Sequence, residues 1–198
     1  MTGAIIRDMR AADVAEALDV FAAVAAEGIW LGTEAGFDRH NRREVWLAGL
    51  ADPVVRTRVV EDPATRRLLG HGTIHLARYG VAELGMNLAA EVRGRGLGGL
   101  LLDDLLDAAR ELGAHKVELQ VWPHNEPALR LYLSRGFTVE GRIREHYRRA
   151  SGQRWDAILM GLGLEADLTS GSRGSDLPDA ACLPKSIPIA TGTPGLPC

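Results

Sequence analysis

Hydrophobic side chains recur every three to four residues in several stretches of the chain, the spacing that places them on one face of a helix. The clearest stretch is 97–112, where leucines line one face and acids and arginines line the other. A second stretch begins after Asp13, a residue type that favours helix starts. Two shorter stretches lie at 38–50 and 125–136, and the glycine at position 136 ends the latter. The pattern predicts four helices.

The remaining apolar segments are short and are bounded by turns such as DPAT and Tyr79-Gly80, which predicts strands. One strand and two helices come first, three strands follow, and helices and strands then alternate up to a hairpin turned at Ser151-Gly152. This order predicts an α/β fold, a mixed sheet of about seven strands with helices on both faces, whose parallel part flanks the helix at 97–112. The expected strands are 4–10, 57–62, 68–77, 81–88, 115–122 and the two arms of the hairpin within 137–164.

Composition and charge limit the function classes. The chain has 198 residues, enough for one domain with a real core, and a formal net charge of -3 with acids and bases mixed along it. It therefore lacks the broad basic surface that nucleic acid binding needs, and small-molecule chemistry is favoured. Arg7 and Asp8 interrupt the opening where a signal peptide needs an apolar core, and no run of about 18 apolar residues occurs. We expect a soluble, cytoplasmic protein without membrane contacts.

The composition changes near Asp167. Residues 167–198 hold five of the nine prolines and show little periodicity, which predicts a flexible or surface-draped tail. A tail that docks on the domain through 182–189 is the alternative. Both cysteines, Cys182 and Cys198, lie in this segment, so we expect neither a disulfide framework nor a cysteine metal site.

Glycines crowd the loop before the strongest predicted helix, in the stretch EVRGRGLGG. Glycine lets a backbone approach a phosphate closely, and a helix N-terminus supplies unpaired N–H groups. The loop fits both the G-x-G-x-x-G of a dinucleotide turn and an R-x-x-G-x-G phosphate loop, in which Arg93, Gly96 and Gly98 hold the signature positions. The dinucleotide reading fits poorly, because AAEVR separates the glycines from the strand and Glu118 lies in mid-strand rather than at a strand end.

A second motif, VWPHNEPALRLYLSRGFTVEG, follows about 35 residues later. With it, the chain resembles the GNAT superfamily of N-acetyltransferases. The first motif resembles the family loop that cradles the CoA pyrophosphate, and the second resembles N-x-x-A-x-x-x-Y followed by Gly-Phe, at Asn125, Ala128 and Tyr132. The resemblance extends in element order from Ile5 to Leu164. It implies a GNAT-like acyl-CoA N-acyltransferase fold, with 1–166 as the acetyltransferase domain.

The resemblance also implies chemistry: direct transfer of the acetyl group of acetyl-CoA to an amine in a ternary complex, without metal or covalent intermediate. An alkyl ammonium has a pKa of about 10 and is no nucleophile, so a base must take its proton, and Glu83 is the expected base. The alternative for Glu83 is an ion pair with an arginine across the sheet. The backbone N–H of Leu88 is expected to stabilise charge on the thioester oxygen, and Tyr132 to protonate the departing thiolate.

A splayed gap between the strands 81–88 and 115–122, as in the family, would admit the pantetheine arm. The residues expected to hold acetyl-CoA are Leu88, Arg93, Gly94, Arg95, Gly96, Leu97, Gly98, Gly99, Asn125 and Ala128.

The acceptor pocket of such enzymes comes from the first two helices and the last hairpin. Acids lie beside aromatics there, which suits a cationic amine with an apolar body. The expected acceptor residues are Glu27, Trp30 and Glu34, with Arg78 as a partial match to an arginine that holds a substrate carboxylate.

The chain resembles phosphinothricin and amino-acid acetyltransferases as well as ribosomal-protein acetyltransferases. A small-molecule amine or amino acid is the expected acceptor. The alternatives are a protein N-terminal acetyltransferase and a non-catalytic acetyl-CoA-binding regulatory module. His71 and His75 share a strand face without a third ligand in reach, so we expect them to be structural and expect no metal. A homodimer is one option for assembly.

Overall fold

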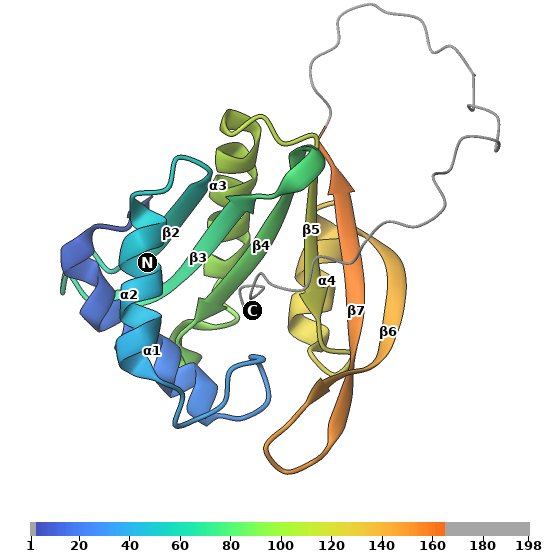
Figure 1. Cartoon of the computed structure of the whole chain (residues 1–198). Helices are drawn as coiled ribbons and strands as arrows, with labels where there is room; N and C mark the ends of the chain where they lie inside the picture. Colours follow the sequence, from blue (N-terminus) through green and yellow to red (C-terminus); the bar gives the residue numbers. More distant parts are fainter. Residues whose placement is uncertain (1–2, 165–198) are drawn as a thin grey trace, which may run out of the picture.

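The computed structural model describes residues 3–164 and contains one seven-stranded sheet with helices on both faces (Figure 1). The predicted α/β architecture and the order of its elements are confirmed. The strands are β1 (Ile5–Asp8), β2 (Val55–Glu61), β3 (Leu68–Leu76), β4 (Val81–Leu88), β5 (Lys116–Val121), β6 (Thr138–Arg148) and β7 (Arg154–Gly163). The α-helices are α1 (Val14–Ala26), α2 (Arg39–Leu50), α3 (Leu97–Glu111) and α4 (Glu126–Ser134).

The sheet splits between β4 and β5. The strands lie in the order β1-β2-β3-β4-β5-β7-β6, and within residues 3–164 the β4–β5 pair is the parallel one. Pairing of these two strands begins at Val81 opposite Lys116 and ends at Glu83 opposite Glu118. Both strands continue, to Leu88 and Val121, and Figure 1 shows them diverging. Beyond Glu83, the backbone groups of β4 that point toward β5 therefore face a gap instead of a paired strand.

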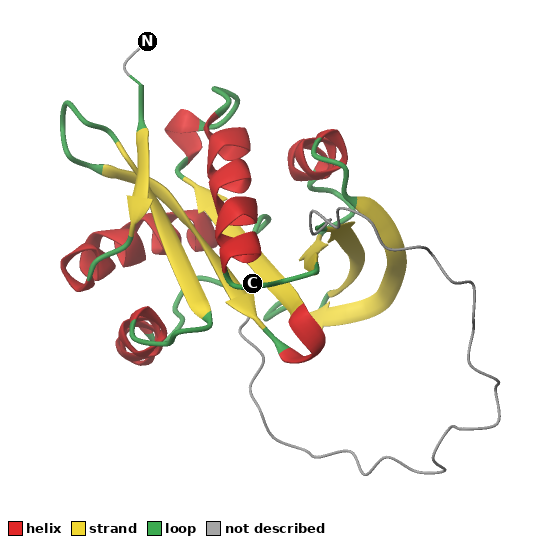
Figure 2. Cartoon of the chain, turned by 90° about the horizontal axis from the view of Figure 1, so that it is seen from above, coloured by secondary structure: helices red, strands yellow, loops and turns green. Residues whose placement is uncertain are grey.

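Two helical layers enclose the sheet (Figure 2). α1 and α2 pack on the face of β2, β3 and β4 opposite to α3. The predicted apolar stripe of α3 is confirmed: Leu101, Leu102 and Leu105 are fully buried against the sheet. Each buried leucine side chain contributes about 1.5–3 kcal/mol of hydrophobic stabilisation. α4 lies beside α3, where Arg135 pairs with Asp103 at 2.9 Å.

The first strand is shorter than expected, ending at Asp8 instead of position 10. Met9 turns into the core, and a 3₁₀ turn at 11–13 leads into α1. Asp13 stands at the predicted helix start, but its carboxylate accepts hydrogen bonds from Arg7 and from the Arg10 backbone N–H instead of capping α1.

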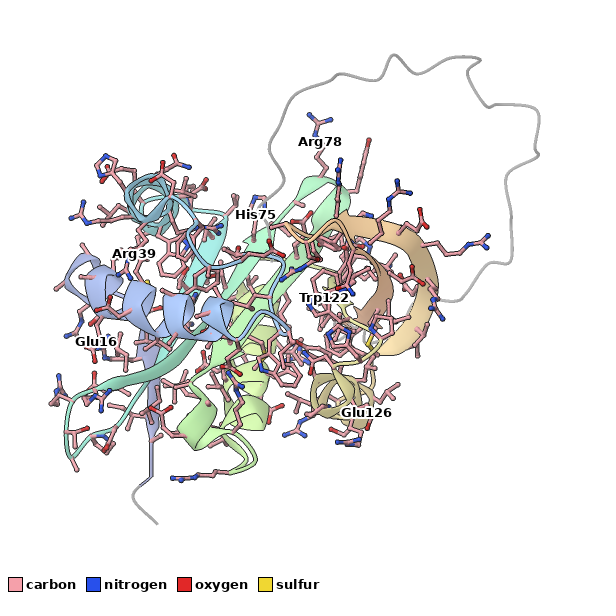
Figure 3. The ribbon with its side chains drawn as sticks, turned by 90° about the horizontal axis from the view of Figure 1, so that it is seen from below. Glu16, Arg39, His75, Arg78, Trp122 and Glu126 are labelled. Carbon is pink, nitrogen blue, oxygen red and sulfur yellow. The ribbon has the colours of Figure 1, made fainter. Side chains whose placement is uncertain are left out.

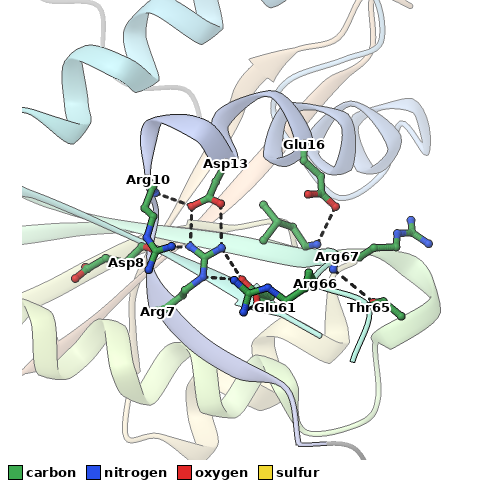
Figure 4. Close-up of polar contacts among 10 residues, drawn as sticks. Arg7, Asp8, Arg10, Asp13, Glu16, Glu61, Thr65, Arg66 and Arg67 are labelled. Atoms are coloured by element: carbon green, nitrogen blue, oxygen red, sulfur yellow. Dashed lines mark hydrogen bonds and ion pairs between the residues drawn. The ribbon is translucent and has the colours of Figure 1, made fainter. Parts of the chain in front are cut away.

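Arg7 joins the first strand to two other elements (Figure 4). It donates to both carboxylate oxygens of Asp13, at 2.7 and 2.9 Å, and to Glu61 Oε2 at 2.7 Å. Glu61 lies at the end of β2 with 1% of its side chain exposed, and Arg66 Nη1 lies 2.7 Å from its other oxygen. Removing one partner of such a buried pair is costly, because it leaves a charge without compensation. The network fixes β1 and the start of α1 on β2, away from the site described below.

Among residues 3–164, no helix is long and apolar enough to cross a membrane. The predicted tail at 167–198 and both cysteines lie outside the described residues.

Candidate functional site

A pocket lies on the sheet face under α1 and α2, where β4 and β5 separate. Alternate residues of two strands form its floor, and Gly85 leaves that floor open, since a Cβ there would meet nothing within 4 Å. Because lining residues come from both sides of the gap, the pocket spans it. The floor residues are His71, Thr73, His75, Glu83, Gly85 and Asn87; the α1–α2 side supplies Phe21, Trp30, Arg42 and Trp46; the far side supplies Gln120, Trp122, Asn125, Tyr132 and Tyr147.

The glycine-rich loop ends at the N-terminus of α3. Gly96 is the N-cap residue, with φ of 83°, a conformation that side chains with a Cβ rarely adopt. In the described chain, the backbone N–H groups of residues 94–98 donate to no protein acceptor. Five donors and the positive end of a helix dipole therefore face one open loop, the arrangement that binds phosphate oxygens. The loop fits the pyrophosphate of the expected acetyl-CoA.

Arg93 ties three parts of the site together. Its Nε donates to the Leu88 carbonyl at 3.0 Å, and its terminal nitrogens donate to the Glu27 carboxylate at 2.7 and 2.6 Å. The guanidinium also lies 5.6 Å from the centre of the Trp30 ring, whose Nε1 donates to Glu27. Hydrogen bonding from Arg93 lowers the pKa of the Glu27 carboxyl. The Arg93 side chain is engaged within the protein, whereas Arg95, two residues along the loop, is exposed. Contacts of either arginine with the cofactor stay predictions.

The other predicted loop residues divide between two tasks. Leu97 packs against the core. A Cβ on Gly98 would lie 3.3 Å from Leu131, and one on Gly99 only 2.5 Å from the Arg135 guanidinium. These two glycines let α3 and α4 approach closely, whereas Gly94 and Gly96 face open space. A contact with the cofactor at Gly99 stays a prediction.

The backbone N–H of Leu88 points toward the gap. Ala89 donates its N–H to the Leu69 carbonyl at 2.8 Å, within the β3–β4 pairing. Successive backbone N–H groups of a strand point to opposite sides, so that of Leu88 is directed away from β3. The Leu88 carbonyl points the same way and accepts from Arg93. This direction suits the predicted donor to a thioester oxygen.

The second motif builds the start of α4 and carries Tyr132 to the pocket. The Asn125 side chain caps the helix by accepting a hydrogen bond from the Ala128 N–H at 3.3 Å. Asn125 also lines the pocket. Tyr132 is 7% exposed, and its ring centre lies 5.6 Å from that of Phe137 in the core. Since α4 lies on the α3 side of the sheet, Tyr132 reaches the pocket through the gap.

Glu83 stands at the last paired position of β4, where the gap begins. Its side chain is 51% exposed, and His75 Nδ1 on the neighbouring strand lies 4.0 Å from its carboxylate. No arginine lies within ion-pair distance of Glu83 among residues 3–164, so the alternative of an arginine partner is wrong. The carboxylate faces the pocket and remains open to solvent.

The expected acceptor residues do not all meet. Trp30 lines the pocket, whereas the Glu27 carboxylate pairs with Arg93 and the Glu34 carboxylate with Arg149. Arg78 is exposed and points outward from the turn between β3 and β4 (Figure 3). The structure therefore brings only Trp30 of this set to Glu83 and Tyr132.

Sequence reasoning missed a buried arginine at the tip of the last hairpin. Arg149 donates to the carbonyls of Gly28, Leu31 and Gly32 at 2.9–3.2 Å, pairs with Glu34 at 2.6 Å, and stacks on Trp155 at 4.3 Å. It fixes the loop between α1 and α2 that covers the pocket. In the sequence it is the second of two adjacent arginines beside the Ser151-Gly152 turn, a pattern typical of an exposed hairpin end.

Of the two histidines on β3, His71 is buried, whereas His75 lines the pocket beside Glu83. The His71 ring is 6% exposed and packs 4.6 Å from Trp46, and Asn87 lies within hydrogen-bond distance of it. Burial, with the nearby Arg42 charge, lowers the pKa of His71 to about 4, so the ring is neutral near pH 7. In the part of the chain that the structure describes, no three His, Cys, Asp or Glu side chains are grouped to hold a metal ion.

Comparison with known proteins gives a consistent result. A sequence model of the acetyltransferase (GNAT) family matches residues 16–137. The chain is 31% identical over 125 residues to a phosphinothricin N-acetyltransferase of Streptomyces coelicolor, covering 61% of this chain and 72% of the relative. It is 26% identical over 139 residues to an L-amino acid N-acetyltransferase of Escherichia coli, covering 61% and 85%.

A phosphinothricin acetyltransferase from Sinorhizobium meliloti, solved in complex with acetyl-CoA, shares the fold. Its TM-score is 0.74 at 19% identity, over 91% of this chain and 98% of that one. Three observations agree with one another: the sheet splits after Glu83, a glycine-rich loop precedes α3, and the family model matches residues 16–137. The chain belongs to the acetyltransferase (GNAT) family of enzymes.

Proposed function

We propose that the protein transfers the acetyl group of acetyl-CoA to the primary amine of a small molecule or amino acid, by direct attack in a ternary complex. The observation that carries this proposal is the pocket that spans the β4–β5 gap. The glycine-rich loop and α4 lie at one side of the sheet, and the α1–α2 loop covers the other. Two substrates entering from opposite faces would meet between Glu83 and Tyr132.

The chain's own residues meet the needs of this reaction. Backbone N–H groups of residues 94–98 and the side chain of Arg95 would hold the pyrophosphate, and Asn125 would bond the pantetheine arm. Acetyl-CoA supplies the acetyl group as a reactive thioester. These residues would orient it with its reacting end in the gap.

Three groups would act on the reacting atoms. Glu83 would accept the ammonium proton, directly or through water, which frees the nitrogen lone pair. The Leu88 N–H would donate to the thioester oxygen, where negative charge grows as the carbon–nitrogen bond forms. Tyr132 would give its proton to the sulfur as the carbon–sulfur bond breaks. As the carbon–sulfur bond breaks, the nitrogen, which still carries one proton more than the amide, would return that proton to the Tyr132 phenolate through water, and Glu83 would release its own proton to solvent. The balance is one proton released per acetyl group transferred, without a metal or a covalent enzyme intermediate.

The test is a turnover assay with purified protein. Acetyl-CoA is mixed with a panel of amines, the twenty amino acids and short peptides with free N-termini, and release of the CoA thiol is followed together with the mass of the product. We expect acetylation of small amines or amino acids. Turnover restricted to peptides would assign a protein N-terminal acetyltransferase instead, and acetyl-CoA binding without any turnover would assign a regulatory module.

The role of Glu83 is tested in the same assay. Glu83→Gln keeps the shape of the side chain but removes its basicity, so we expect kcat to fall by about 100-fold near pH 7, within the usual range for general-base catalysis. Glu126→Gln, on the outer surface of α4, serves as the matched control (Figure 3). An unchanged kcat in Glu83→Gln would mean that another group or bulk water accepts the proton.

A further inference from the structure

Arg42 is a cation in the pocket wall that lacks an acidic partner. It lies in the first turn of α2, and its guanidinium carbon is 5.3 Å from the Phe21 ring centre and 5.8 Å from that of Phe37. Its one hydrogen bond to another side chain runs from Nη2 to Thr33 Oγ1, at 3.3 Å. Within residues 3–164, no carboxylate lies within 4.0 Å of it.

Other arginines of the site are compensated. Arg93 has the Glu27 carboxylate, and the more deeply buried Arg149 has Glu34 together with three backbone carbonyls. Partly burying a cation without an acid costs free energy, and proteins ordinarily pair such groups. Burial also lowers the pKa of the Arg42 guanidinium, although an arginine stays charged at neutral pH. Among the residues that the structure describes, Arg42 therefore lacks a compensating acid, and an anionic ligand in the pocket would supply one.

Within the described chain, the pocket side chains next to Arg42 are aromatic or neutral. α1 contributes Phe21, and the strand below contributes His71, whose ring is neutral near pH 7. Among the described residues that line the pocket, Glu83 is the one carboxylate, and it stands across the floor on β4. The acceptor side of the pocket thus has a cation in one wall and a carboxylate at the gap, with open floor at Gly85.

We propose that Arg42 binds a carboxylate of the acceptor, so that the preferred substrates are small amines that also carry a carboxylate, such as free amino acids. The guanidinium has five donors in a planar fork and can bind a carboxylate through two parallel hydrogen bonds. With its carboxylate at Arg42, the substrate directs its ammonium group toward Glu83 and the gap. This inference rests on the proposed function and specifies its substrate class.

The experiment compares each of the twenty amino acids with its C-terminal amide, which keeps the amine but loses the negative charge. For the wild type we expect kcat/KM to favour the best acids over their amides by at least about 10-fold. Arg42→Met should lower kcat/KM for the acids by about 10- to 100-fold, leave the amides nearly unchanged and leave the KM for acetyl-CoA unchanged. Arg43→Met, one residue along α2 and exposed, is the control.

Folding is measured on the same variants. Because Arg42 has no ion pair to lose and lies beside Phe21 and Phe37, Arg42→Met should keep or raise the midpoint of thermal unfolding. A merely structural arginine would lower it. Equal use of acids and amides by the wild type, or an equal loss for both in Arg42→Met, would overturn the proposal.

If no amine is turned over, the proposed function fails but the site is still tested. The unfolding midpoint is then measured with CoA and each acid or amide. A rise with acids that is absent with amides and absent in Arg42→Met supports the carboxylate site, because a ligand that binds only the folded state raises the midpoint. No rise with any acid would overturn it.

Discussion

The carboxylate of Glu27 is bound by its own neighbours. It accepts two hydrogen bonds from Arg93 and one from Trp30, and Arg93 in turn holds the Leu88 carbonyl beside the cofactor loop. Its sequence pattern instead predicted contact with a cationic acceptor. The structure favours Glu27 as a residue that positions Arg93 beside the glycine-rich loop.

The two roles of Glu27 predict different kinetics. Since the Arg93 pair is about two-thirds buried, we expect Glu27→Gln to raise the KM for acetyl-CoA by about 5- to 10-fold, with a smaller effect on the acceptor KM. Steady-state kinetics with each substrate varied in turn measure both constants, and Glu44→Gln on α2 is the control. A rise confined to the acceptor KM would show that Glu27 contacts the acceptor directly.

His71 makes stability depend on pH. Its pKa is lowered to about 4 in the folded protein from 6.5, so the unfolded state takes up the proton first as pH falls. The contribution of the neutral His71 ring to the free energy of unfolding is complete above pH 6.5 and is lost as the pH falls from 6.5 to 4. At about 1.4 kcal/mol per pKa unit, the loss is roughly 3 kcal/mol.

Denaturant unfolding at pH 7, 5.5 and 4.5 measures this dependence. His71→Gln should flatten the free energy of unfolding over this range relative to the wild type, whereas His40→Gln at an exposed position of α2 should not. Parallel curves for the wild type and His71→Gln would show that other groups set the acid limit.

The glycine-rich loop leads into α3, and the two ends of this helix offer a matched test. Gly96 before the helix and Gly113 after it have φ of 83° and 81°, and a Cβ at either position meets nothing within 4 Å. Alanine should therefore cost about 1 kcal/mol of stability at each position. Only at Gly96 does the added methyl group enter the open loop whose N–H groups would bind phosphate.

We expect Gly96→Ala to weaken acetyl-CoA binding by 10-fold or more and Gly113→Ala to leave it unchanged, as measured by calorimetric titration. Equal affinities in the two variants would show that the phosphates bind elsewhere.

The elements that sequence patterns predicted best are those whose burial repeats regularly. The leucines of α3 and the alternating residues of β5 are buried as their spacing required. The first strand was predicted too long, because Met9 and the turn at 11–13 follow tertiary packing and not local periodicity.

The glycine-rich loop before α3 was predictable because its backbone conformation demands glycines at fixed spacing. The arrangement of the charged residues around the pocket was not. Arg42 lies in the polar run RHNRRE, which is indistinguishable from a solvated helix surface until α2 is packed against α1 and β2. The roles of Glu27 and Glu34 likewise depend on which arginines fold against them, Arg93 at 66 residues' separation and Arg149 from the last hairpin.

For the whole molecule, the split sheet supplies the space in which the proposed transfer between two substrates would occur. Regular pairing holds β4 and β5 together up to Glu83. Beyond that point the pocket opens between the glycine-rich loop and the loop between α1 and α2. Arg149 fixes the loop between α1 and α2 to the β6–β7 hairpin, so the walls of the pocket come from nearly the whole length of the domain.

In the proposed mechanism, acetyl transfer takes place in this gap with Tyr132 as the proton donor. The most direct measurement is kcat of Tyr132→Phe with the best acceptor, alongside its affinity for acetyl-CoA and the exposed control Tyr79→Phe. We predict that kcat falls by about 100-fold in Tyr132→Phe while the affinity for acetyl-CoA stays at the wild-type value. A wild-type kcat in Tyr132→Phe would contradict the account.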